Sequence, residues 1–119
     1  MPIKNQMYKR TFFFDLDGTL FRHGTTNFLP GAKELLDKLI TNDCRIIFVT
    51  RRGDLEFEGH PVYGQEATQK ALKEHGLDKH TIIFDVMSPR YLVDDSEAYV
   101  VAVETNEGFN LDDFTADRD

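Results

Sequence analysis

Short apolar runs recur along the chain and are bounded by charged or turn-forming residues. Residues 10–16 ("RTFFFDL"), 44–50 ("CRIIFVT") and 81–86 ("TIIFDV") are typical of strands buried on both faces of a sheet. The second run is rich in β-branched residues, which favour strands. Residues 90–95 ("RYLVDD") indicate a fourth strand. The pattern therefore predicts four strands separated by other elements.

Helical periodicity fills the intervals between these runs. Residues 30–43 place leucines and isoleucine at helical spacing after Pro30, and residues 65–77 place Ala67, Ala71 and Leu72 on one face. Residues 96–108 ("SEAYVVAVETNEG") are ambiguous, because their valines favour a strand. A parallel continuation after the fourth strand needs a crossover, however, so we expect a helix there, followed by a brief edge strand at 109–111.

Alternating strands and helices predict an α/β fold. We expect a three-layer, Rossmann-like parallel sheet with helices on both faces. At 119 residues the chain fits one domain, with a core at about 10–111 and an acidic tail at 112–119.

Composition narrows the function classes. The net charge of −7 argues against broad, non-specific nucleic-acid binding, and no apolar run is long enough to span a membrane. The opening residues lack a signal-peptide pattern, and Cys44 has no partner for an internal disulfide. These features indicate a cytoplasmic protein that is not bound to a membrane.

Polar side chains follow the predicted strands where each one ends. Asp15 and Asp17 follow the first strand, Thr50 ends the second, and Asp94 and Asp95 end the fourth. In a parallel α/β sheet these ends form the edge where ligands bind. Carboxylates crowded at one edge repel one another unless a cation lies between them, and oxygen ligands without a His/Cys cluster favour Mg²⁺. The pattern predicts a magnesium site.

The motifs at these strand ends resemble those of the haloacid dehalogenase superfamily. "DLDGTL" is similar to its first motif, "IIFVT" to its second and "YLVDDS" to its fourth, in the family's order. The resemblance implies that Asp15 is a nucleophile that forms an aspartyl-phosphate, and that Asp17 is the general acid and then the base. An aspartate at position 17 favours a phosphatase or phosphomutase within this family.

The same resemblance implies roles for the remaining motif residues. Thr50 would donate a hydrogen bond to the transferred phosphoryl group, and Gly18 and Thr19 would bind substrate. Mg²⁺ would be bound by Asp15, the main-chain carbonyl of Asp17 and Asp95, with Asp94 acting directly or through water. Taken alone, Thr50 would rather be a helix cap or a strand-end residue.

The family's third motif, a lysine or arginine before the fourth strand, has no clear match. Arg90 in "VMSPRYLVDD" is the basic residue there, and a guanidinium does not simply replace an ammonium in the same geometry. Arg52 is the other candidate for phosphate binding, because "VTRR" resembles the Thr-x-Arg form of the second motif found in relatives that include polynucleotide 3′-phosphatase domains.

The spacing between the motifs leaves no room for the family's cap domains. An open site suits a phosphorylated small molecule, a nucleotide or a nucleic-acid end, unless a homo-oligomer covers it. His23 and His60 lie in loops expected to border the site, where either could touch substrate, although a surface position is favoured for both. Phe57 and Tyr63 could pack locally or flank a substrate, and local packing is favoured.

Two other function classes remain open. One is a catalytically weak or inactive phosphate-binding relative that lacks the motif-three lysine. The other is a receiver domain phosphorylated on Asp85 at the end of the third strand, although such a domain has no need of "DGT". Phosphate release separates the first from a phosphatase, and phosphorylation by a small phosphodonor would reveal the second.

Overall fold

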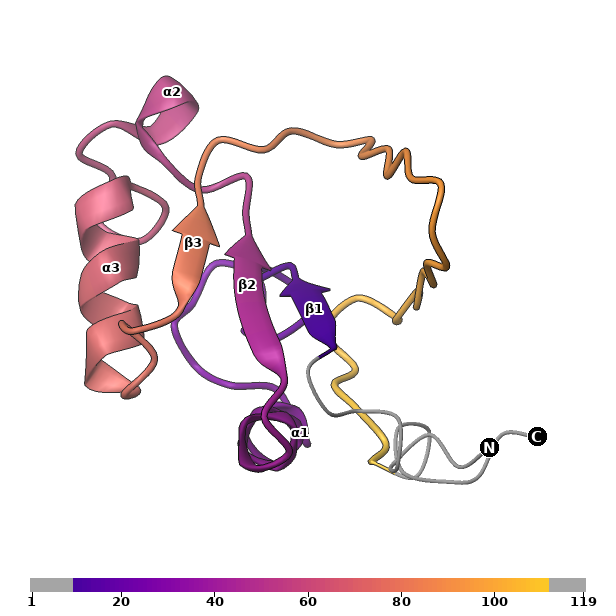
Figure 1. Ribbon diagram of the computed structural model, residues 1–119. Coiled ribbons are helices and arrows are strands. Elements are labelled where there is room, and N and C mark those ends of the chain that lie inside the picture. Colours follow the sequence, from indigo (N-terminus) through magenta and orange to yellow (C-terminus); the bar gives the residue numbers. More distant parts are fainter. Residues whose placement is uncertain (1–9, 112–119) are drawn as a thin grey trace.

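A computed structural model of the protein describes residues 10–111 (Figure 1). The elements follow one another as β1 (Thr11–Phe14), α1 (Ala32–Thr41), β2 (Arg45–Val49), α2 (Asp54–Phe57), α3 (Gln65–Glu74) and β3 (Thr81–Ile83). Each of the first three predicted strands is present, as are the first two predicted helices. α2 is a single turn within a stretch expected to be irregular.

The strands form one parallel sheet in the order β1-β2-β3. Phe13 lies beside Ile47, and Ile47 lies beside Thr81, so the carboxyl ends of all these strands point to the same edge. The prediction of an α/β protein with a parallel sheet is confirmed.

The hydrophobic core lies on one face of the sheet. Phe14, Ile46 and Phe48 point toward it, because side chains alternate between the two faces of a strand. The helices α1 and α3 cover this face with apolar side chains at helical spacing. The core cluster contains Phe14, Leu16, Leu20, Phe21, Ala32, Leu35, Leu36, Leu39, Cys44, Ile46, Phe48, Leu72 and Leu77.

The opposite face of the sheet is more open. Ile47 is buried there, but 58% of Phe13 and 46% of Ile83 are exposed. The expectation that the first strand is buried on both faces is therefore wrong for Phe13. A third layer is not seen in residues 10–111.

The segment that follows β3 contains neither helix nor strand as far as residue 111. The predicted strand at 90–95, helix at 96–108 and edge strand at 109–111 are therefore wrong. Asp94 Oδ1 accepts the backbone N–H of Ser96 at 2.8 Å, a local bond that competes with strand pairing. The valines that follow disfavour a helix, because β-branched side chains lose rotamer freedom in one. As Figure 1 shows, this segment makes a wide excursion away from the sheet.

The end of this segment returns to β1 and α1. Asn106 N donates to Gly18 O at 2.9 Å, and Phe109 N donates to Pro30 O at 2.8 Å. The ring of Phe109 meets that of Phe14 edge-on at 6.2 Å. Residues 105–109 thus close over the turn that follows β1. The predicted acidic tail at 112–119 lies outside the described residues.

No helix in residues 10–111 has the length and apolar character needed to cross a membrane.

Candidate active site

A tight turn after β1 carries the first two candidate residues, Asp15 and Asp17. Leu16 O accepts the N–H groups of Thr19, Leu20 and Phe21, at 3.2, 3.0 and 2.8 Å. Gly18 has a φ of +79°, in the left-handed region that glycine adopts without strain. The turn holds both carboxylates at the carboxyl edge of the sheet, as the sequence predicts.

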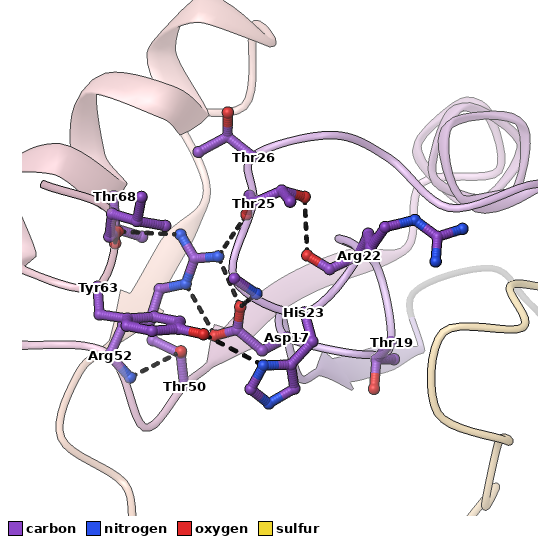
Figure 2. A network of polar contacts seen from close by, with 12 residues as sticks. Asp17, Thr19, Arg22, His23, Thr25, Thr26, Thr50, Arg52, Tyr63 and Thr68 are labelled. Atoms are coloured by element: carbon purple, nitrogen blue, oxygen red, sulfur yellow. Dashed lines mark hydrogen bonds and ion pairs between the residues drawn. The ribbon is translucent and has the colours of Figure 1, made fainter.

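Asp17 forms a two-point ion pair with Arg52 (Figure 2). Arg52 Nε donates to Asp17 Oδ2 at 2.8 Å, and Arg52 Nη2 donates to Asp17 Oδ1 at 2.7 Å. This planar fork fixes the carboxylate in both position and orientation. Gly24 N adds a longer bond of 3.4 Å to Asp17 Oδ1.

Arg52 is fully buried, with 0% of its side chain exposed. Its remaining donors reach main-chain carbonyls: Nη2 donates to Thr25 O at 2.6 Å and Nη1 to Val62 O at 3.3 Å. The rings of Phe21 and Tyr63 lie 5.5 and 5.4 Å from its guanidinium carbon. Arg52, predicted to bind substrate, here holds Asp17 in place.

Thr50 is also fully buried and ends β2. Its Oγ accepts the backbone N–H of Arg52 at 3.0 Å. Its own N–H donates to Ile83 O, and its carbonyl accepts the N–H of Val86. Thr50 thus links β2 to β3 and shapes the turn that directs Arg52 toward Asp17.

Asp15 lies beside Arg90, which comes from the segment after β3. Arg90 Nη1 is 3.3 Å from Asp15 Oδ1, and Arg90 Nη2 donates to Val86 O at 3.0 Å. Thr19 Oγ1 donates to Asp15 Oδ2 at 3.4 Å. Burial raises the pKa of Asp15 above its usual 3.8, and the charge of Arg90 partly opposes that rise. The structure brings Arg90 to the site edge.

Asp94 and Asp95 lie apart from this arrangement. Both are exposed on the segment after β3, where their oxygens interact with Ser96. Within residues 10–111, no three His, Cys, Asp or Glu side chains form a group that could hold a metal ion. The residues as placed do not fit the predicted magnesium site.

An imidazole and a phenol flank the Asp17 turn and were not assigned a role by the motifs. His23 Nδ1 lies 3.1 Å from the hydroxyl of Tyr63, and His23 N donates to Asn106 Oδ1 at 2.7 Å. For Tyr63, local packing was favoured over a place beside the substrate. No spacing in the sequence connects residues 23, 63 and 106, because only the fold brings their segments together.

Other charged and polar residues near the ends of β2 and β3 have structural partners. Asp85 Oδ1 accepts the N–H of Leu55 at 3.0 Å, so this carboxylate caps the turn of α2. Arg51 pairs with Glu56 on the surface at 2.9 Å. His60 Nδ1 accepts the N–H groups of Val62 and Tyr63.

Comparison with known proteins finds no matching family model, curated protein or solved structure. The likeness to the haloacid dehalogenase superfamily is carried by the motifs of this chain.

Proposed function

We propose that the protein is a phosphomonoester hydrolase that works through an aspartyl-phosphate on Asp15. An oxygen of Asp15 attacks phosphorus, and the bond from phosphorus to the ester oxygen breaks. Asp17 in its protonated form gives its proton to the departing alcohol. The resulting carboxylate, which is the form that pairs with Arg52, then takes a proton from the water that attacks the phosphoryl-aspartate. Inorganic phosphate leaves, and both carboxyl groups return to their starting state.

The observation that carries this proposal is the placement of Asp17. A carboxylate that serves as acid and base must hold a fixed position against the reacting oxygen. The buried guanidinium of Arg52 grips both Asp17 oxygens and is itself locked by two carbonyls and two rings. Oδ2 keeps a further lone pair for a substrate or water, whereas Oδ1 also accepts the N–H of Gly24. This support holds the ionised form of Asp17, which is the base that takes a proton from water.

The surroundings of Asp15 agree with a nucleophile that meets a dianionic group. About a third of its side chain (33%) is exposed, so one side is accessible. Arg90 lies 3.3 Å from Asp15 and is itself partly exposed, and its guanidinium can bind phosphoryl oxygens because it matches their geometry. In this proposal Arg90 binds the phosphoryl group, which is the role of the basic residue of the third motif.

Membership of the haloacid dehalogenase superfamily, with its three-layer fold and without a cap domain, is part of this proposal. We also propose that the site is open and takes a small phosphomonoester, a nucleotide or a nucleic-acid end. The alternative is a site that a homo-oligomer covers. A cytoplasmic location, with which the single cysteine Cys44 agrees, is also part of the proposal. The motif resemblance implies dependence on Mg²⁺, but the residues as placed do not fit the metal, and the chemistry above takes no step through it.

Hydrolysis of an aryl phosphate by the wild type and by Asp15→Asn tests the proposal, each with Mg²⁺ and with a chelator. We expect the wild type to release phosphate and Asp15→Asn to release none. Loss of wild-type activity in the chelator supports metal dependence. Equal activity of the two proteins would rule out Asp15 as the nucleophile.

The second candidate is a phosphate-binding protein with little or no turnover. The separation of Asp94 and Asp95 from Asp15 favours it, since the predicted acidic cluster does not form in residues 10–111. Calorimetric binding of inorganic phosphate without release from any phosphomonoester would favour this function over hydrolysis.

A further inference from the structure

The backbone of His23 is fixed to the turn that carries Asp17. His23 N donates to Asn106 Oδ1 at 2.7 Å, and Asn106 N donates to Gly18 O at 2.9 Å. The neighbouring Gly24 N reaches Asp17 Oδ1. The backbone at residues 23 and 24 is therefore tied to both Asp17 and Gly18.

The imidazole ring of His23 is oriented as well. Its Nδ1 lies 3.1 Å from the Tyr63 hydroxyl, and the Tyr63 ring packs against the Arg52 guanidinium (Figure 2). His23 Cδ2 lies only 3.8 Å from the point where a Cβ on Gly18 would stand. Because Cδ2 is bonded to Nε2, this ring nitrogen is held beside the Asp17–Gly18 turn.

Among the histidines of residues 10–111, His23 and His60 are exposed, whereas His75 and His80 are half-buried. His23 differs from His60 in that its Nδ1 meets a side-chain hydroxyl beside the Asp17 turn, and no hydrogen bond to its Nε2 is formed within this part of the chain. His60 accepts main-chain N–H groups, and His75 Nε2 contacts Thr26 O. His80 Nε2 is buried. Holding an exposed side chain costs rotamer freedom, which a binding role would explain.

We propose that His23 is a specificity-determining residue that contacts the alcohol portion of the substrate through Nε2. The inference rests on the proposed function. Asp17 protonates the ester oxygen there, so the alcohol portion lies on the Asp17 side of the site. A hydroxyl near that oxygen can hydrogen-bond to imidazole Nε2. The substrate class is a phosphomonoester of a polyhydroxylated alcohol, such as a sugar phosphate or nucleotide.

The test compares hydrolysis of ribose 5-phosphate with that of phenyl phosphate, whose alcohol portion has no hydroxyl besides the ester oxygen. His23→Ala is expected to lower kcat/KM for ribose 5-phosphate about tenfold, the effect of one well-placed hydrogen bond, and to change it less than about threefold for phenyl phosphate. His23→Gln places an amide nitrogen near Nε2 and should retain most of the activity. His23→Asn, which reaches only the Nδ1 position, should behave like His23→Ala.

Tyr63→Phe keeps the ring against Arg52 but removes the hydroxyl that orients His23. It should raise KM for ribose 5-phosphate with little change in kcat, and added to His23→Ala it should have no further effect on KM.

Equal losses on both substrates would make His23 a support for Asp17 and overturn the inference, as would unchanged kinetics in the His23 variants. A wild type that hydrolyses aryl phosphates alone would contradict it too, while leaving the phosphatase proposal intact. A wild type without any hydrolysis overturns both.

Discussion

The carboxylate of Asp17 and the guanidinium of Arg52 meet in a two-point ion pair, with Nε–Oδ2 and Nη2–Oδ1 distances of 2.8 and 2.7 Å. The residues are separated by 35 positions in the sequence and come from the ends of neighbouring strands. Arg52 is fully buried, and 14% of the Asp17 side chain is exposed. Removing one partner therefore leaves the other with a poorly solvated charge.

Arg52→Met is expected to lower the free energy of unfolding by about 3–5 kcal/mol, because it strands the buried Asp17 carboxylate. Arg51→Met is the matched control, since Arg51 is adjacent but pairs with Glu56 on the surface. Its cost should stay within about 1 kcal/mol. Urea unfolding of both variants gives the values, and similar costs for the two would contradict the structural role of Arg52.

Residues 105–109 pack over the turn that follows β1, and alanine substitutions at two glycines of positive φ test this packing. Gly108 has a φ of +82°, and a Cβ there would stand 2.3 Å from Pro30 O. Gly76 has a φ of +73° with nothing within 4 Å of such a Cβ. Gly76→Ala should cost about 1–2 kcal/mol from backbone strain alone. Gly108→Ala should cost about 1–3 kcal/mol more, from the clash with Pro30. Equal unfolding midpoints would argue against this packing.

His80 should make the protein less stable in mild acid. Burial, with a smaller contribution from Lys79, lowers the pKa of His80 below its usual 6.5. The unfolded chain then binds the proton more readily than the folded one. The stability that the folded protein gains from a neutral His80 is fully present above pH 6.5, and it is lost as the pH falls through the pKa of His80 in the folded state. His80→Gln should therefore lose less stability than the wild type between pH 8 and pH 5. An unchanged pH dependence in this variant would contradict the prediction.

The acid limb of the pH–rate profile should follow the ionisation of Asp15, because this carboxyl group must be ionised to attack phosphorus. Burial raises its pKa above 3.8. The pH at which kcat/KM falls should therefore be higher than it would be for an ordinary aspartate. The Arg90 charge lowers that pKa, so Arg90→Ala should move the limb to higher pH and weaken activity severely while leaving the fold intact. A pH–rate profile of both proteins, with circular dichroism as the folding control, measures this. An acid limb that does not move would separate Arg90 from Asp15.

Much of the fold follows from local pattern, because the first three strands and both main helices bury apolar faces against one another. The segment after β3 could not be predicted in the same way. Its run of valines and tyrosines has strand propensity, yet propensity acts only where a neighbouring strand or helix supplies packing. Tyr99, Val100 and Val101 are instead exposed.

The ends of the first two predicted strands correctly placed Asp15, Asp17 and Thr50 at the carboxyl edge of the sheet. The burial of Arg52 was not predictable, because an arginine next to another arginine is expected at the surface. Its partners lie in distant loops, which only the fold brings close to it. The same holds for Arg90, whose contact with Asp15 depends on the course of an irregular segment.

Trapping of the phosphoryl-enzyme is the direct test for an aspartyl-phosphate on Asp15. Asp17→Asn should slow the attack of water on the intermediate, because the base is lost. The substrate is a radiolabelled aryl phosphate, whose phenolate departs without a proton from residue 17. After incubation and an acid quench, peptide mapping locates the phosphoryl group. We expect label on Asp15 and none in the Asp15→Asn protein. Hydrolysis by the wild type with label on Asp85, or with no label on Asp15 in Asp17→Asn, would contradict it.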